Sequence, residues 1–141
     1  MSSKRIVIVD DNKEFAEELR ELLYLCGYYV KVVTNSLDAF KTARKLKPNL
    51  ILLDLKMNGM NGFQVAEQLK QSKETFDIPI VAMSGYFPIE KESILLDMAN
   101  MDSRLKKPFS ILDLIDCIEG ILSRINNDME TAVMYSEYVQ G

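Results

Sequence analysis

Histidine is absent from this chain of 141 residues. Its absence excludes Ser-His-Asp and Cys-His nucleophilic centres, and it removes the commonest side-chain ligand of metals in proteins. Any chemistry therefore has to be built from carboxylates, hydroxyls, lysines and the backbone.

Cysteine is scarce, since Cys26 and Cys117 are the only two in the chain. Neither belongs to a CxxC or metal-binding pattern, and both lie among apolar residues at helical spacing. We predict that both are reduced residues of the core, with a disulfide or redox role as the alternative.

Long apolar runs and an excess of basic charge are also missing. No run approaches the ~20 residues that a membrane span needs, so no membrane association is expected. The first five residues lead directly into a strand-like run and leave no room for a signal peptide, so the cytoplasm is the expected compartment.

The net charge of −4, from 17 basic and 21 acidic residues, argues against direct nucleic-acid binding by this domain. A separate DNA-binding domain is not excluded.

What the chain does contain is an alternation of two kinds of apolar segment. Short continuous runs rich in valine and isoleucine are typical of strands buried on both faces, as in a parallel sheet. Four such runs and a weaker fifth occupy residues 6–9, 29–33, 50–53, 78–83 and 104–106.

Stretches with apolar residues three or four positions apart lie between these runs and predict amphipathic helices. They cover residues 15–26, 39–46, 63–69, 94–101 and 111–125. Gly27 and Pro48 are stop signals for the first two helices, and Ser110 with Asp113 forms an approximate capping box for the last. Strands that alternate with helices predict an α/β fold, a (βα)5 doubly wound parallel sheet of five strands.

We expect one domain over residues 4–125 and a C-terminal tail over residues 126–141. The tail carries a weak apolar stripe of Met129, Val133, Met134 and Tyr138. It is interpreted as a short extra helix, a partner-binding tail or the stub of a linker.

Polar side chains follow four of the predicted strands. Asp10 and Asp11 come after the first strand, Asp54 after the third, Ser84 after the fourth and Lys107 after the fifth. Ligands of open α/β sheets bind beyond the carboxyl ends of the strands. In a parallel sheet all five residues would meet at that edge.

Three carboxylates at one edge need a partner. Two carboxylates about 4 Å apart repel by about 4 kcal/mol at an effective dielectric constant of 20, so three of them favour raised pKa values or a bound cation. A hard divalent ion such as Mg²⁺ would answer this, and it would neutralise the charge of an incoming phosphoryl group. A carboxylate could then act as the nucleophile and form an acyl phosphate, while a hydroxyl and a lysine contact the phosphate oxygens.

Each of these residues has an ordinary interpretation when it is taken alone. An Asp-Asp-Asn segment after a strand is a common turn or helix cap, and Ser84-Gly85 is a common turn signal. The joint pattern at the ends of four strands instead favours metal-assisted phosphoryl transfer.

Taken together, these residues resemble the receiver domains of two-component response regulators. The resemblance covers Lys4 to about Arg124 and rests on residues 6–12, 48–57, 62, 80–85 and 107–109. It implies a receiver domain over residues 4–125 with the flavodoxin-like strand order 2-1-3-4-5.

The resemblance also implies a phosphoacceptor and a metal site. Asp54 would accept a phosphoryl group from a sensor histidine kinase or a phosphotransfer protein of a phosphorelay. Asp11, Asp54 and the backbone carbonyl of Lys56 would bind Mg²⁺ (or Mn²⁺) directly, and Asp10 would act mainly through water. The protein would be a signalling phosphoacceptor that assists its own phosphotransfer and dephosphorylation, and not an enzyme.

Two further residues would respond to the phosphoryl group. Ser84 would hydrogen-bond it and move on activation, and Lys107 would pair with it. The resemblance implies a cis peptide bond between Lys107 and Pro108, which is rare among X-Pro bonds. The implied output surface is the fourth helix, fifth strand and fifth helix, which would bind a second copy of the chain or an effector.

The chain departs from the family pattern at four positions, Asn58, Ser84, Gly85 and Arg104. Many family members carry a switching aromatic ring where this chain has Arg104, and an arginine would need a partner for its charge if it were buried. We therefore expect Tyr86 to replace part of that switch. Lys56 and Tyr86 are expected to flank the path of the water that hydrolyses the acyl phosphate.

Two other classes of protein are alternatives to a receiver. A Mg²⁺-dependent phosphatase or phosphotransferase with an aspartyl-phosphate intermediate usually has a DxD nucleophile motif after its first strand. Here that strand is followed by Asp10-Asp11-Asn12, and we expect no cap domain to hold a substrate. A nucleotide-binding module is disfavoured because the GxGxxG and P-loop motifs are missing.

Overall fold

The computed structural model describes residues 3–85 and 101–140. Tyr86 lies outside the described residues, and so does the helix predicted over residues 94–101, of which only residue 101 is described. The chain divides into two compact units, Met1–Phe109 and Ser110–Gly141, and each is described by itself.

The first unit contains a parallel sheet of five strands within the described part of the chain. In chain order they are β1 (Arg5–Val9), β2 (Tyr29–Val33), β3 (Leu50–Asp54), β4 (Ile80–Ser84) and β5 (Ser103–Lys106). The spatial order is β2-β1-β3-β4-β5, and each neighbouring pair is parallel. This confirms the predicted fold class and strand order.

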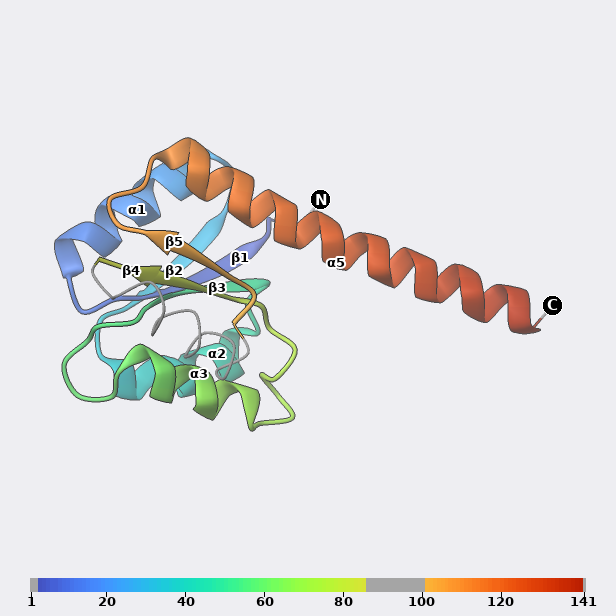
Figure 1. The fold of residues 1–141 in the computed structure, drawn as a ribbon, viewed down its shortest axis with the longest axis horizontal. Helices are drawn as coiled ribbons and strands as arrows, with labels where there is room; N and C mark the ends of the chain where they lie inside the picture. The colour runs from blue at the N-terminus through green and yellow to red at the C-terminus, as the bar shows by residue number, and fades with distance from the viewer. Residues whose placement is uncertain (1–2, 86–100, 141) are drawn as a thin grey trace. The chain divides into compact units, whose positions relative to one another are not determined.

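Helices cover both faces of this sheet. They are α1 (Lys13–Leu25), the 3₁₀ turn η1 (Ser36–Asp38), α2 (Ala39–Leu46) and α3 (Gly62–Lys70). Figure 1 shows α1 on one face of the sheet and α2 with α3 on the other. Because both faces are covered, every residue of β3 and β4 is buried, as their continuous apolar runs predicted.

Helix α1 begins where the sequence offers a cap. The Asn12 side chain accepts a hydrogen bond from the Phe15 backbone N–H, and Ala16, Leu19 and Leu23 form the buried face. The helix ends before Gly27, whose φ of +97° is a left-handed conformation that favours glycine.

The prediction that both cysteines belong to the core is wrong for Cys26, which is exposed, while Cys117 is half-buried. Cys26 lies at the C-cap of α1, one position beyond the last helical residue, and its neighbour Leu25 is exposed as well. Both cysteines are among the described residues, and they form no disulfide with each other.

The second unit is the helix α5, which runs without interruption over Ile111–Gln140. The Ser110 hydroxyl accepts the Asp113 backbone N–H at 3.1 Å, as the predicted cap requires. The expectation that the helix ends near residue 125 is wrong, because no glycine or proline interrupts residues 121–140. Residues 126–137 are exposed, and no helix of the described residues is long and apolar enough to cross a membrane.

Candidate functional site

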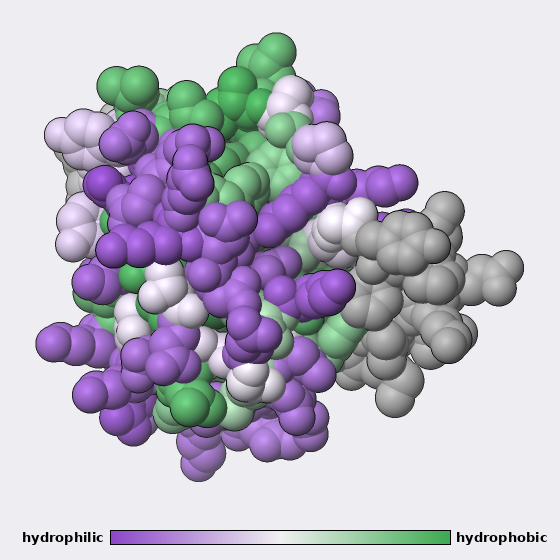
Figure 2. All heavy atoms as spheres, turned by 90° about the vertical axis from the view of Figure 1, so that its left-hand side faces the viewer, coloured by the Kyte–Doolittle hydropathy of each residue, from purple (hydrophilic) through white to green (hydrophobic). Residues whose placement is uncertain are grey.

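The carboxyl ends of the strands place four predicted residues on one edge of the sheet. Asp10 directly follows β1, Asp54 ends β3, Ser84 ends β4 and Lys107 directly follows β5. The parallel register pairs the last residues of neighbouring strands, so the side chains beyond them come together. Figure 2 looks onto this edge, where most of the coloured side chains are hydrophilic.

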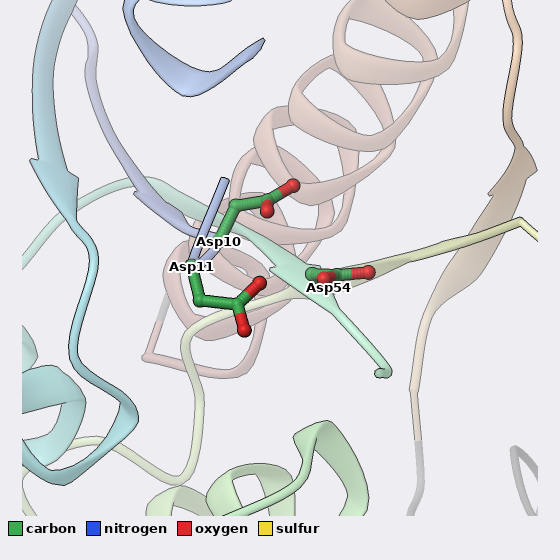
Figure 3. A group of neighbouring side chains, drawn as sticks. All are labelled: Asp10, Asp11 and Asp54. Atoms are coloured by element: carbon green, nitrogen blue, oxygen red, sulfur yellow. The ribbon is translucent and has the colours of Figure 1, made fainter. Parts of the chain in front are cut away.

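Asp10, Asp11 and Asp54 form a carboxylate cluster at this edge. One carboxylate oxygen of each residue lies within 4.8 Å of the other two. Asp10 is completely buried and Asp54 is 6% exposed, whereas Asp11 is exposed at the rim. Figure 3 shows the three carboxyl groups around one small space. The sequence prediction that these residues converge is therefore met in the structure.

The cluster is held by defined hydrogen bonds. Asp10 accepts the Asn12 backbone N–H through Oδ1 at 2.9 Å and the Lys107 ammonium through Oδ2 at 2.7 Å. Asp11 accepts the Asn58 backbone N–H through Oδ2 at 3.0 Å. The Lys107 Nζ also lies 3.6 Å from Asp54 Oδ1. The ammonium thus lies between the two buried carboxylates.

The electrostatic balance of the cluster remains negative. Burial, followed by the charge of Asp10, raises the pKa of Asp54 to about 6, although Lys107 and the backbone N–H of Lys56 act in the opposite direction. The charge of Asp11 adds a further small increase to that pKa. The three carboxylates carry more charge than the one neighbouring ammonium neutralises, and their oxygens are the ligands that a hard divalent cation prefers. These residues therefore fit Mg²⁺.

Ser84 and Lys107 are joined through the backbone. The Lys107 N–H donates to the Ser84 carbonyl at 2.6 Å, and the Ser84 side chain is buried. The Lys107–Pro108 peptide bond is cis, as the resemblance implied. Arg104 lies in β5 and is exposed, which agrees with the expectation that its charge opposes burial.

The first residue of α3 has to be glycine, because this position lies close to the end of β3. A Cβ atom on Gly62 would clash with the Asp54 carbonyl oxygen and would lie 2.7 Å from Leu55 Cα. Asn61 caps α3 in a reciprocal capping box with Gln64. This close approach of α3 to the end of β3 fixes the backbone that carries Asp54.

Two contributions were missed by sequence reasoning. The Asn58 backbone N–H binds Asp11, and a backbone donor leaves no signature in the side chain at its position. The Phe15 ring lies beside Lys107, with Nζ 4.2 Å from the ring centroid, although its position in an apolar stripe indicated only core packing. Lys56 has an exposed side chain, and its backbone N–H hydrogen-bonds the Asp54 carboxylate.

Known proteins with similar sequences include proteins named response regulators. A response regulator receiver protein of Anaeromyxobacter sp. (strain Fw109-5) is 41% identical over 54 residues, which are 38% of this chain and 23% of that protein. Sporulation initiation phosphotransferase F of Bacillus subtilis (strain 168) is 37% identical over 60 residues, 43% of this chain and 48% of that protein. The chain spans less than half the length of these curated relatives.

Solved structures with this fold include receiver domains of a response regulator and of a sensor histidine kinase. A CheY-like receiver domain protein of Methanospirillum hungatei JF-1 has a TM-score of 0.83 and 25% identity, and the match covers 90% of this chain and 99% of that one. The receiver domain of a sensor histidine kinase from Pseudomonas aeruginosa PAO1, solved with a magnesium ion in its active-site cleft, has a TM-score of 0.79 and 20% identity. That match covers 86% of this chain and 99% of the other.

A family model also matches most of the chain. The response regulator receiver domain matches residues 6–119, which include all the residues of the carboxylate cluster as well as Ser84 and Lys107. The chain therefore belongs to the response regulator receiver domain family.

Proposed function

We propose that this chain is the phosphoacceptor receiver of a two-component phosphorelay and that Asp54 takes the phosphoryl group. The donor would be a phosphohistidine of a sensor histidine kinase or a phosphotransfer protein. The observation that carries the proposal is the buried Asp54 carboxylate, which lies at the strand ends within the acidic cluster and 3.6 Å from an ammonium. We place this reaction in the cytoplasm.

In the proposed step, a carboxylate oxygen of Asp54 attacks phosphorus and the phosphorus–nitrogen bond of the phosphohistidine breaks. The imidazole leaves with the bonding electron pair and takes up a proton. The attacking carboxylate has to be ionised, and a pKa of about 6 leaves it mostly ionised at pH 7. Hydrolysis of the acyl phosphate later releases phosphate and restores the carboxylate.

A divalent cation, Mg²⁺ or Mn²⁺, would be held by Asp11, Asp54 and the Lys56 carbonyl, with Asp10 acting through water. It would supply positive charge to the phosphoryl oxygens. The cluster of three carboxylates with one neighbouring ammonium supports this assignment. The magnesium ion in the cleft of the Pseudomonas receiver domain gives further support.

Ser84 and Lys107 would respond to the modification. A phosphoryl group adds about two negative charges and new acceptors, which the Ser84 hydroxyl and the Lys107 ammonium would bind. These contacts exist only in the phosphorylated chain, so they shift the population towards the active state. A change in the ratio of active to inactive chains from 1:99 to 99:1 takes about 5.5 kcal/mol of differential stabilisation.

The output surface would comprise the fourth helix, β5 and α5, and it would bind a second copy or an effector.

The test is phosphorylation by acetyl phosphate with Mg²⁺, followed by intact mass. We expect one labile phosphoryl group on the wild type, none on Asp54→Asn, and normal uptake by the control Asp77→Asn, whose side chain is exposed. Equal labelling of Asp54→Asn would disprove the assignment. Rapid repeated consumption of added phosphoesters would instead favour an aspartyl-phosphate enzyme.

Lys56 is proposed to control the lifetime of the acyl phosphate, because its exposed side chain belongs to the residues that directly follow Asp54. We expect Lys56→Ala to change the rate of dephosphorylation after the phosphodonor is removed. The same rate for this variant and the wild type would contradict the role.

A further inference from the structure

The aromatic ring of Phe15 is a third neighbour of the Lys107 ammonium. Phe15 lies in the first turn of α1, and the Lys107 Nζ is 4.2 Å from the centroid of its ring. The same nitrogen donates to Asp10 Oδ2 at 2.7 Å and lies 3.6 Å from Asp54 Oδ1. The ammonium is therefore surrounded by two carboxylates and one ring.

The position of this ring is set from both sides. Phe109, two residues after Lys107, packs against the Phe15 ring with its centroid 6.0 Å away and an interplanar angle of 77°. This edge-to-face arrangement is a preferred geometry of aromatic pairs. The Phe15 backbone N–H donates to the Asn12 side chain, and the Asn12 N–H in turn donates to Asp10. The ring and the buried carboxylate are thus positioned by the same short segment.

We propose that Phe15 is a positioning residue, whose ring holds the Lys107 ammonium between Asp10 and Asp54 before the phosphoryl group arrives. The inference rests on the function proposed for Asp54 and Lys107. It assigns a role in the phosphoryl-transfer site to a residue outside the acidic cluster.

A ring is suited to this role because it attracts a cation without carrying a charge. The quadrupole of the aromatic face attracts the ammonium, and the attraction grows when the site is shielded from water. A third carboxylate at this place would compete with the incoming phosphoryl oxygens for Lys107, whereas the ring does not. The flexible lysine side chain would otherwise have to be ordered when the phosphoryl group arrives, which has an entropic cost.

Simple apolar packing in the α1 stripe does not require an aromatic residue at this position. A leucine would continue the stripe but would offer no face to the ammonium. Phe15→Leu therefore removes the ring while keeping an apolar side chain, and Phe15→Tyr keeps the ring. Phe76→Leu is a matched control, because Phe76 is exposed and belongs to none of the contacts around Lys107.

The experiment measures the rate constant of phosphoryl uptake from acetyl phosphate at fixed Mg²⁺ for the full chain. We expect Phe15→Leu to lower this rate constant about three- to tenfold, as the loss of one cation–π contact implies. Phe15→Tyr should keep the rate constant of the wild type, because it keeps the ring, and Phe76→Leu should leave the rate constant unchanged. The proton shifts of the Lys107 ε-methylene group, measured by NMR without any phosphodonor, should show the ring current in the wild type and lose it in Phe15→Leu.

A double-mutant cycle separates positioning from general packing. In a Lys107→Met background, Phe15→Leu should have no further effect on the rate, because the cation that the ring holds is gone. A merely structural role would lower the rate by the same factor in both backgrounds. Thermal unfolding of each variant verifies that it is folded at the assay temperature.

Two outcomes would overturn the inference while the proposed function stands. One is an unchanged rate for Phe15→Leu, and the other is an equal loss with and without Lys107. Phosphoryl uptake by Asp54→Asn equal to that of the wild type would instead refute the proposed function. The NMR shifts report the contact between the ring and the ammonium in either case.

Discussion

At the scale of single residues, the buried Asp54 carboxylate links folding to pH. Its pKa of about 6 in the folded chain lies above its ordinary value of 3.8. Between these two values the folded chain binds more protons than the unfolded chain. The free energy of unfolding therefore falls as the pH rises through this interval and levels off above it.

We predict that Asp54→Asn stabilises the chain at pH 7 in the absence of divalent ions. The substitution removes a buried charge, and the expected gain in the free energy of unfolding is about 2 kcal/mol. The gain should largely disappear near pH 4, where the carboxyl is protonated in the folded wild type. Urea denaturation at both pH values measures it, with Asp77→Asn as an exposed control. An equal gain at both pH values would contradict the explanation.

The positions of most residues in the candidate site could be predicted from residue identity. Asp10, Asp54 and Ser84 each stand at the end of an apolar run, and the parallel sheet brings them to one edge. The contact between Phe15 and Lys107 could not be predicted in the same way. It depends on side-chain conformations and on the approach of β5 to α1, and neither is encoded in residue spacing.

At the scale of secondary-structure elements, the start of α3 is a tightly constrained position near the site. Gly62 is its first residue, and backbone atoms of Asp54 and Leu55 leave no room for a side chain there. The helix can therefore approach the end of β3 only with glycine at this position.

We predict that Gly62→Ala lowers the free energy of unfolding by about 1–3 kcal/mol, as overpacking does in other proteins. The matched control is Gly120→Ala in α5, where a Cβ atom meets nothing within 4 Å. That control should raise the free energy of unfolding by roughly 0.5–1 kcal/mol, because alanine replaces glycine inside a helix. Denaturant midpoints measure both changes, and equal effects would refute the steric argument.

Element boundaries were predicted less well than element types. Every described strand appears close to its predicted position, because buried parallel strands have continuous apolar runs. The end of α5 was placed near residue 125 because the apolar stripe fades there, yet the helix continues to Gln140. The end of an apolar stripe shows where the helix stops being buried. The helix itself continues until its backbone hydrogen bonds are interrupted.

At the scale of the whole molecule, ion binding should be coupled to stability. A cation that binds only the folded chain raises the free energy of unfolding by about 2.7 kcal/mol at 100 times its Kd. We predict that added Mg²⁺ raises the thermal midpoint of the wild type and that Asp11→Asn weakens this response. Calorimetry with and without Mg²⁺ measures it, and an equal shift in Asp11→Asn would argue against a ligand role for Asp11.

The exposed end of α5 should be dispensable for the chemistry. Residues 126–137 are exposed, and all the proposed site residues belong to the first compact unit. We predict that a chain ending at Ile125 takes up phosphoryl groups from acetyl phosphate at the rate of the full chain. A large loss of rate with a normal thermal midpoint would show that the tail contributes to the reaction.

The ion pair between Lys107 and Asp10 joins residues 97 positions apart in the chain. Ribosomes make proteins from the N-terminus, so a nascent chain contains the acidic cluster well before it contains Lys107. Until then the two buried carboxylates would lack their ammonium, and β5 would be missing from the sheet. A nascent chain is therefore expected to lack the complete proposed phosphoacceptor site until β5 and Lys107 have emerged from the ribosome.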